Sequence, residues 1–277
     1  MSIEQILVLA IVQGLTEFLP VSSSGHLILV PAFTGWQDQG QVTDVMVHVG
    51  SLLAVIVYFW RDVLNLLRGT GELVRGRMTD RARLALIIAV ATVPALVFGA
   101  VLKFTGAADA MRASGPLIVA TGAIVFGVLL YLADRFGPRS KRMEDMAFGT
   151  GILIGVAQAV ALVPGTSRSG ITITAARTMG FRRDEAARFS FLLGIPAIAA
   201  AGLFETLSAV SAGASVGADA LWAAFFTFFA AIAAIAILMA VVRRTSFLVF
   251  VVYRLALGLL LFAMIYDWFP GLLPTIG

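Results

Sequence analysis

Long apolar runs, separated by short polar segments, follow one another along almost the whole chain. A helix of about 20 apolar residues is long enough to cross the hydrocarbon core of a bilayer. The longest nearly uncharged runs approach or reach that length, and each predicts a membrane-spanning helix. The predicted spanning helices are residues 45–60, 84–102, 115–133, 189–204, 220–242 and 245–266, and the basic segment 61–83 is expected to be a loop.

Two further apolar segments are each interrupted by a polar break. Residues 3–19 end at Pro20, a turn-forming serine run follows, and the apolar stretch 26–33 is too short to cross a core of about 30 Å. Residues 147–163, the break 164–170 and residues 171–179 repeat this order. Helix, break and short helix predict a re-entrant hairpin, whose irregular backbone is tolerated at membrane depth only inside protein or beside a water-filled cavity.

The two hairpins indicate an internal repeat. Aligned on their Ser-x-Ser-Gly ends, they lie 145 residues apart, and the same offset superposes Gln13 on Gln158. Each half, about 1–134 and 146–277, then holds one hairpin and three crossings. Because three is odd, the second half must be inverted relative to the first, as in many transporter folds. We therefore predict a single-domain, all-α integral membrane protein with an inverted-topology repeat.

The composition supports a membrane protein and excludes several kinds of site and partner. The chain is 60% hydrophobic and 13% charged, with a mean hydropathy of +0.96. It has no cysteine, which excludes disulfides, thiolate metal sites and a cysteine nucleophile. The net charge of +4 is spread through short loops, so we expect no nucleic acid partner. The first residues carry Glu4 and no basic residue, so we expect no cleaved signal.

The basic residues also predict an orientation. If segment 61–83 is cytoplasmic, alternation of the crossings places sixteen of the twenty Lys and Arg residues on that side. Both termini then lie outside the cytoplasm. Arg168 and Arg254 fall inside membrane segments, where an ionisable residue is expensive and indicates function by default.

The first break, Q-G-L-T-E-F-L-P-V-S-S-S-G-H at 13–26, concentrates candidate chemistry. Gln13 and Glu17 share a helical face. The three serines supply candidate nucleophiles, and His26 is a candidate acid or base. Glu17 is expected to orient that imidazole or to bind a divalent cation. The structural alternatives are serines that only cap a helix, a hydrogen-bonded core His26, and an ion pair from Glu17 to a membrane arginine.

The second break, P-G-T-S-R-S-G at 164–170, adds a guanidinium suited to bidentate phosphate contact. Two inverted hairpins can bring their tips together and point two helix N-termini at one cavity, which favours an anion. We therefore predict an intramembrane phosphate site. Beside Arg168, the expected substrate-binding residues are Ser22, Ser24, Gly25, Gly165, Thr166, Ser167, Ser169 and Arg254. His48, near the outer end of its helix, is expected to be a packed or interfacial residue.

With these motifs, the chain resembles the BacA-type undecaprenyl pyrophosphate phosphatases of bacteria along nearly its whole length. The resemblance implies removal of the terminal phosphate of a C55 prenyl pyrophosphate, which recycles the carrier lipid of cell-wall synthesis and confers bacitracin resistance. It implies that Glu17 matches the second acid of the family's (E/Q)-x-x-x-E motif. Ser23 and His26 match its active-site serine and histidine, and Arg168 its phosphate-binding arginine. Gln13 stands where the first acid of that motif can be.

The mechanism that we expect is phosphoryl transfer at the hairpin tips. Ser23 attacks, His26 handles the proton, Arg168 neutralises charge, and Glu17 holds the imidazole or a metal. A His26 nucleophile and direct attack by water remain open. Mg²⁺ or Ca²⁺ is the expected cofactor, with Glu17 and Gln13 as metal ligands, although an amide is a weaker ligand than a carboxylate.

The expected partners are the prenyl pyrophosphate lipid and the bilayer, and a homodimer is left open. The expected location is the bacterial inner membrane, as a multi-pass protein whose active site opens to the periplasm. The alternative function is a transporter or flippase of phosphorylated prenyl lipids, since an inverted repeat with an intramembrane arginine also suits transport. The Ser-x-x-His group together with Glu17 favours the enzyme, because anion binding alone does not need it.

Overall fold

The computed structural model describes every residue except 38, 108–109, 112–114, 212, 214 and 269–277. Helices form almost all of its regular structure, with one isolated bridge between Lys141 and Phe181. The elements are α1 (Ile3–Thr16), α2 (Ser23–Thr34), α3 (Gly40–Tyr58), α4 (Trp60–Val74), α5 (Asp80–Phe104), α7 (Gly115–Phe136), η1 (Met143–Asp145), α8 (Phe148–Val160), α9 (Arg168–Thr178), α10 (Arg183–Ser211), α11 (Ala218–Arg244) and α12 (Leu248–Ile265).

Six of these helices are long and apolar enough to cross a membrane: α3, α5, α7, α10, α11 and α12. They correspond to the six predicted crossings, so the prediction of an all-α integral membrane protein is confirmed. Helix α10 begins six residues earlier than the apolar run predicts. Its first turn carries Asp184 and Glu185, whose negative charges suit a helix N-terminus.

The basic segment 61–83 is not the loop that was expected. Residues Trp60–Val74 form α4, which packs against α5 as a helical hairpin. Charged residues fill one face of α4, while Leu66 on another face packs against the main hydrophobic core. Hydropathy averaged along the chain hides such an amphipathic helix, because its apolar positions recur only every three or four residues.

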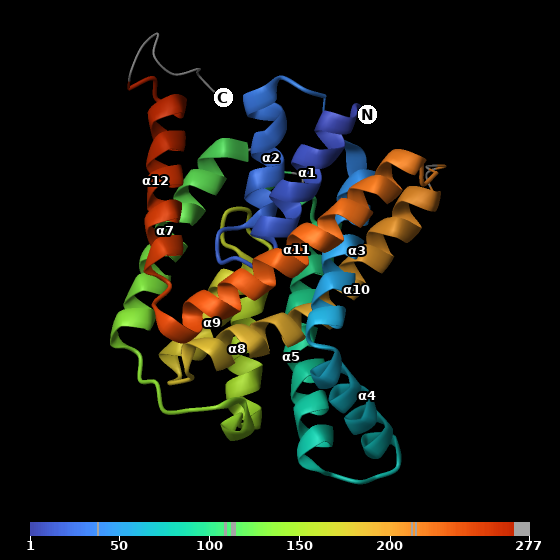
Figure 1. Ribbon diagram of the computed structural model, residues 1–277, viewed down its shortest axis with the longest axis vertical. Helices are drawn as coiled ribbons and strands as arrows, with labels where there is room; N and C mark the ends of the chain where they lie inside the picture. The colour runs from blue at the N-terminus through green and yellow to red at the C-terminus, as the bar shows by residue number, and fades with distance from the viewer. Residues whose placement is uncertain (38, 108–109, 112–114, 212, 214, 269–277) are drawn as a thin grey trace.

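The short helices lie in the middle of the molecule. Figure 1 shows α1 and α2 in its upper half and α8 and α9 in its lower half, with the two breaks facing each other. Helices α7 and α12 lie on one side of them, and α3, α5 and α10 on the other (Figure 1). The Ser169 hydroxyl donates a hydrogen bond of 3.0 Å to the carbonyl of Leu19, so the two breaks are in direct contact.

The main core packs beside this contact and buries much of it. Phe18, in the first break, is fully buried and meets the ring of Phe191 of α10 edge-on at 5.3 Å. The same core includes Phe59 from the junction of α3 and α4 and Ile173 from α9. Polar groups at the breaks therefore have few water molecules to bond and must find partners within the protein.

Candidate active site

The two breaks share an unusual backbone. Ser22 and Ser167 have φ values of 77° and 71°, in the left-handed region that residues with a side chain rarely adopt. Each is the N-cap of the helix that follows, and its hydroxyl accepts a hydrogen bond from the N–H of Gly25 or Gly170. Backbone strain of this kind persists only where the surroundings enforce it, and it clusters at functional sites.

Arg254 of α12 ties the two breaks together. Its side chain is fully buried, and its five N–H groups all donate to backbone carbonyls. The acceptors are Pro20 in the first break, Gly165 and Thr166 in the second, and Gly122 and Ala123 of α7, at 2.8–3.2 Å. The expected substrate-binding role of Arg254 stays a prediction, and in this arrangement it would require one of these bonds to break, because no donor remains for a phosphate.

Glu17 is the centre of the polar cluster. It is the C-cap of α1 and is only 7% exposed. One carboxylate oxygen accepts a hydrogen bond of 3.2 Å from Nη2 of Arg168, which also makes an ion pair. The other accepts from the Ser23 hydroxyl at 2.6 Å and from the Gln13 amide at 3.0 Å. Two of the other three residues expected to be catalytic, Ser23 and Arg168, therefore contact Glu17 directly.

Arg168 differs from Arg254 in how its guanidinium is used. Nη1 donates to the carbonyl of Ser190 at 3.2 Å, Nη2 donates to Glu17, and Nε has no hydrogen-bond partner. The guanidinium lies flat against α10 at Gly194, where a Cβ atom would come within 2.0 Å of Nη1. The protein thus holds this cation in place while leaving donors unused, as anion binding requires.

His26 is held by residues other than Glu17. Its Nδ1 lies 2.6 Å from the carbonyl oxygen of Ser22, and its Nε2 lies 2.6 Å from the hydroxyl of Tyr253. The two rings are stacked, with centroids 5.7 Å apart. A carbonyl can only accept, so Nδ1 carries the proton of the neutral ring and Nε2 accepts from Tyr253. In this arrangement the imidazole is thus oriented by Ser22 and Tyr253, and the role of Glu17 in orienting it stays a prediction.

His48 is the histidine near Glu17. Its Nε2 lies 3.7 Å from the Glu17 carboxylate, and its Nδ1 bonds the carbonyl of Asp44 within α3. The expectation that His48 is a packed or interfacial residue stays a prediction, and this contact places it beside the central carboxylate. Neither His48 nor Tyr253 could be linked to the first break from sequence, since nothing in the pattern tells which helices pack beside it.

The remaining predicted binding residues divide by exposure. Ser24 is exposed, and its hydroxyl lies 3.4 Å from that of Ser22. The polar side chains of the second break are more deeply buried than Ser24. The Ser167 and Ser169 hydroxyls lie 3.2 Å apart, and the Thr166 hydroxyl is buried without a hydrogen-bond partner. The binding roles of Ser22, Ser24, Gly25, Gly165, Thr166, Ser167 and Ser169 stay predictions.

The residues around Glu17 offer limited ligands for a cation. The part of the chain that the structure describes contains no group of three or more His, Asp or Glu side chains able to hold a metal ion. Gln13 directs its amide nitrogen to Glu17, which leaves its buried Oε1 without a partner. One carboxylate and one amide oxygen fit Mg²⁺ or Ca²⁺ only if a ligand supplies further oxygens.

The arrangement combines a fixed cation with unused donors, a hydroxyl bonded to a carboxylate, and a histidine with a defined free nitrogen. The nitrogen of that histidine is free of a proton rather than of partners, because Nε2 accepts from the Tyr253 hydroxyl. This combination suits phosphoryl transfer, in which charge must be neutralised and a nucleophile must lose a proton. The same residues lie within the part of the chain that matches known proteins. Residues 6–260 match the family model of the bacitracin resistance protein BacA. The chain belongs to the BacA family.

Curated members of the BacA family resemble the chain from end to end. An undecaprenyl-diphosphatase of Ruegeria pomeroyi is 49% identical, over 96% of this chain and all of that protein. Those of Erythrobacter litoralis and Alcanivorax borkumensis are 48% and 47% identical, over 95% and 93% of this chain and 99% and 97% of theirs. The resemblance inferred from the two breaks is therefore confirmed at the level of the BacA family.

Proposed function

We propose that the chain is an undecaprenyl-diphosphatase, which hydrolyses the terminal phosphate of undecaprenyl pyrophosphate to give undecaprenyl phosphate. The reaction recycles the lipid carrier of cell-wall synthesis. The observation that carries this proposal is the contact between the two breaks, where the partly used guanidinium of Arg168 and the Ser23 hydroxyl meet on Glu17. The names of the curated relatives support the same substrate.

Arg168 binds the terminal phosphate in this mechanism. Its position against α10 is fixed by Ser190 and Glu17, so the guanidinium does not reorganise when the substrate arrives. A fixed cation in a site of low dielectric stabilises developing charge far more than it would in water. The N–H groups of the first turn of α2 add to this field.

Ser23 is the proposed nucleophile, and the geometry favours Glu17 rather than His26 as its base. Ser23 Oγ forms a bond to the terminal phosphorus while the bond from that phosphorus to the bridging oxygen breaks. Undecaprenyl phosphate leaves with the electron pair, and the serine proton passes to Glu17, 2.6 Å away. Water then attacks the phosphoserine: its oxygen bonds phosphorus as the bond to Ser23 Oγ breaks, and its proton passes to Nε2 of His26 once the Tyr253 hydroxyl turns aside. His26 afterwards releases that proton to bulk water. Glu17 returns its proton to Ser23, and inorganic phosphate is released.

The proposed cofactor is Mg²⁺ or Ca²⁺, held by Glu17, by the unpartnered Oε1 of Gln13 and by oxygens of the diphosphate. When bound, the cation would neutralise part of the diphosphate charge. Gln13→Glu should then change the apparent metal affinity more than turnover at saturating metal. An unchanged metal titration would place Gln13 outside the ligand set.

We further propose that the two halves form an inverted repeat with a periplasmic site. The shared offset of 145 residues between Ser22 and Ser167, which have the same backbone conformation and capping bond, supports the repeat. The α4–α5 turn and the segment before α8 lie at the lower end of Figure 1, opposite the end of α2. Two of the four basic segments therefore lie at one end, which we assign to the cytoplasm.

Impermeant thiol labelling of single cysteines in intact bacterial cells tests this orientation. A cysteine at Trp36, beside the end of α2, should be labelled, and one at Gly76, in the α4–α5 turn, should not. The opposite pattern would invert the orientation and move the site to the cytoplasmic side.

Release of inorganic phosphate tests the function itself. The purified protein in detergent should release phosphate from undecaprenyl pyrophosphate and none from undecaprenyl phosphate, which lacks the anhydride bond. The Glu17–Ser23 contact favours an enzyme over a transporter of the same lipid, because transport needs no activated hydroxyl. A folded, pure protein that binds the lipid but releases no phosphate would refute the proposal.

A further inference from the structure

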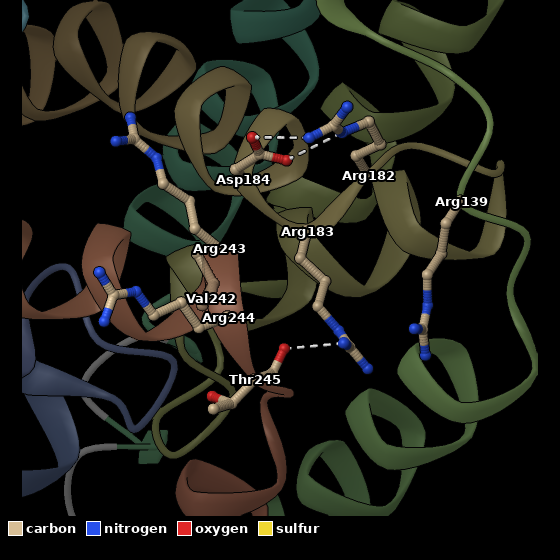
Figure 2. Close-up of a pocket in the computed structure, with 8 residues that line it drawn as sticks. All are labelled: Arg139, Arg182, Arg183, Asp184, Val242, Arg243, Arg244 and Thr245. Atoms are coloured by element: carbon tan, nitrogen blue, oxygen red, sulfur yellow. Dashed lines mark hydrogen bonds and ion pairs between the residues drawn. The ribbon is translucent and has the colours of Figure 1, made fainter.

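The arginine-lined cavity at the ends of α10 and α11 does not form an anion site. Five arginines line this cavity of about 320 Å³. In Figure 2, however, the side chains of Arg243 and Arg244 point away from that of Arg183. Arg183 is itself held by Asp134, which accepts from its Nε at 2.7 Å and from its Nη2 at 2.8 Å. The guanidinium groups therefore do not converge on one ligand.

Tyr253 contacts the active site at a position that matters more for the chemistry. It belongs to the spanning helix α12 and directly precedes Arg254. Its hydroxyl lies 2.6 Å from Nε2 of His26, and the planes of the two rings differ by 13°. Nε2 is the nitrogen that takes the proton of water in the proposed mechanism. Tyr253 therefore covers the base that the second step needs.

Both nitrogens of His26 are occupied in this arrangement. Nδ1 donates to the carbonyl of Ser22 at 2.6 Å, and Nε2 accepts from Tyr253. A tyrosine hydroxyl carries one proton and can donate it to only one acceptor at a time. While that proton points at Nε2, the imidazole has no lone pair for a water molecule. The empty site is thus held in a form that cannot use His26 as a base.

The side chain of Tyr253 has room to turn away from His26. It is 45% exposed, on the same exposed face of α12 as Val249 and Leu260, and no hydrophobic cluster of the described residues includes it. Its hydroxyl has no other hydrogen-bond partner within the described part of the chain. Arg254 fixes the neighbouring backbone through five hydrogen bonds. The ring can therefore turn about its side-chain torsions while α12 stays in place.

A phosphoryl group on Ser23 supplies the acceptor that would draw the hydroxyl away. Ser23 and His26 are three residues apart in the first turn of α2, so their side chains lie on one face, with Cβ atoms about 5–6 Å apart. The oxygens of a phosphoryl group are anionic, and a hydrogen bond to a charged oxygen is about twice as strong as one between neutral groups. The tyrosine hydroxyl therefore forms a stronger bond when it turns from the neutral imidazole to the phosphoryl group.

We propose that Tyr253 is a further catalytic residue, whose hydroxyl leaves Nε2 of His26 and donates to an oxygen of the phosphoryl group on Ser23. This inference rests on the proposed function and adds to it the event that frees the base. Tyr253 keeps its proton throughout, so only hydrogen bonds are exchanged. Nε2 then accepts the proton of the attacking water, and the tyrosine stabilises the charge that develops on the phosphoryl oxygens.

The variant Tyr253→Phe tests this role, because it keeps the stacked ring and removes only the hydroxyl. Hydrolysis of the phosphoserine should become rate-limiting, and kcat should fall by about 10- to 100-fold, the range expected for losing one hydrogen bond to a charged group. The ratio kcat/KM, which reports the steps up to departure of undecaprenyl phosphate, should change by less than about threefold. Rapid mixing should show a larger burst of undecaprenyl phosphate than in the native protein, with phosphate retained on Ser23.

Tyr266→Phe is the matched control. Tyr266 lies at the end of the same helix, about 20 Å from Tyr253 along its axis, and its ring stacks on that of Phe262. This control should retain the native kcat and burst. Equal turnover in the two variants, or equal losses of kcat and kcat/KM in Tyr253→Phe, would overturn the role of Tyr253 alone. A native protein that releases no phosphate would refute the proposed function, and this inference with it.

Infrared difference spectra test the change of acceptor directly, even if Tyr253→Phe does not fold. With ring-labelled tyrosine, addition of orthovanadate as a mimic of the phosphoryl group should shift the C–O stretch of one tyrosine as its hydroxyl changes acceptor. The chain has four tyrosines, and the shift should persist in Tyr58→Phe, Tyr131→Phe and Tyr266→Phe, which assigns it to Tyr253. A spectrum without a shifted tyrosine band would overturn the proposal.

Discussion

Gly194→Ala should inactivate the enzyme without unfolding it. A Cβ atom at this position of α10 would lie 2.0 Å from Nη1 and 2.6 Å from Cζ of Arg168, where ordinary contact begins at 3.4 Å. The guanidinium must therefore retreat by about 1.4 Å, which breaks its 3.2 Å bonds to Ser190 and Glu17. A displacement of about 1 Å in a positioning group can cost about 100-fold in rate, and we expect a loss of that order in kcat/KM.

The protein should tolerate the change, because the displaced atoms are the far end of a flexible side chain and alanine favours a helix by about 1 kcal/mol over glycine. Gly202→Ala is the matched control: it lies on the same helix, and its added Cβ would meet nothing within 4 Å. Phosphate release and thermal unfolding should be measured for both. Turnover of Gly194→Ala equal to that of Gly202→Ala would refute the reasoning. In the Arg168→Ala background no guanidinium remains to be displaced, so adding Gly194→Ala should cost little further activity. A further loss as large as that of Gly194→Ala alone would also refute the reasoning.

Five other substitutions test the neighbouring contacts. Arg168→Lys keeps the charge but loses the fork, so phosphate release should fall by about two orders of magnitude or more, and near-normal turnover would sink the phosphate-binding role. Ser23→Ala should abolish turnover, because it removes the nucleophile. Ser22→Ala and Ser24→Ala should mainly lower stability, by about 0.5–2 kcal/mol where a helix cap is lost. Equal, mild losses of turnover in all three variants would mean that the serines only shape the turn. Arg254→Lys should lower the midpoint of thermal unfolding, and an unchanged midpoint would contradict its role as a tie between the breaks.

The sequence predicts the helices and the two breaks well, because both rest on local signals. Apolar runs mark the crossings, and Pro20 with the following serines marks the end of one helix and the cap of the next. The pairing of Glu17 with Arg168 was already among the structural alternatives, since two opposite charges in apolar surroundings seek each other. What the sequence could not supply is which other helices face these groups.

The residues that were missed share this cause. His48 reaches Glu17 from α3, and Tyr253 reaches His26 from α12, across 227 residues of chain. Gly194 reads as an ordinary glycine in an apolar helix, and its role depends on the guanidinium that lies against it. The amphipathic helix α4 was missed for a different reason: its many charges lower the mean hydropathy, although its apolar positions follow a helical period.

Arg254 shows how an intramembrane charge can be structural even though burying one is expensive. Its guanidinium replaces the water that five backbone carbonyls would otherwise need, and those carbonyls belong to both breaks and to α7. A lysine offers three donors, so at least two of these carbonyls would lose their partner in Arg254→Lys, at about 1–3 kcal/mol each. The destabilisation should thus reach about 2–6 kcal/mol, with the breaks loosened before the spanning helices separate. Turnover should fall as the breaks loosen, yet the KM of molecules that remain folded should change little, because Arg254 has no free donor for the phosphate. A large rise in KM with unchanged stability would instead confirm Arg254 as a substrate-binding residue.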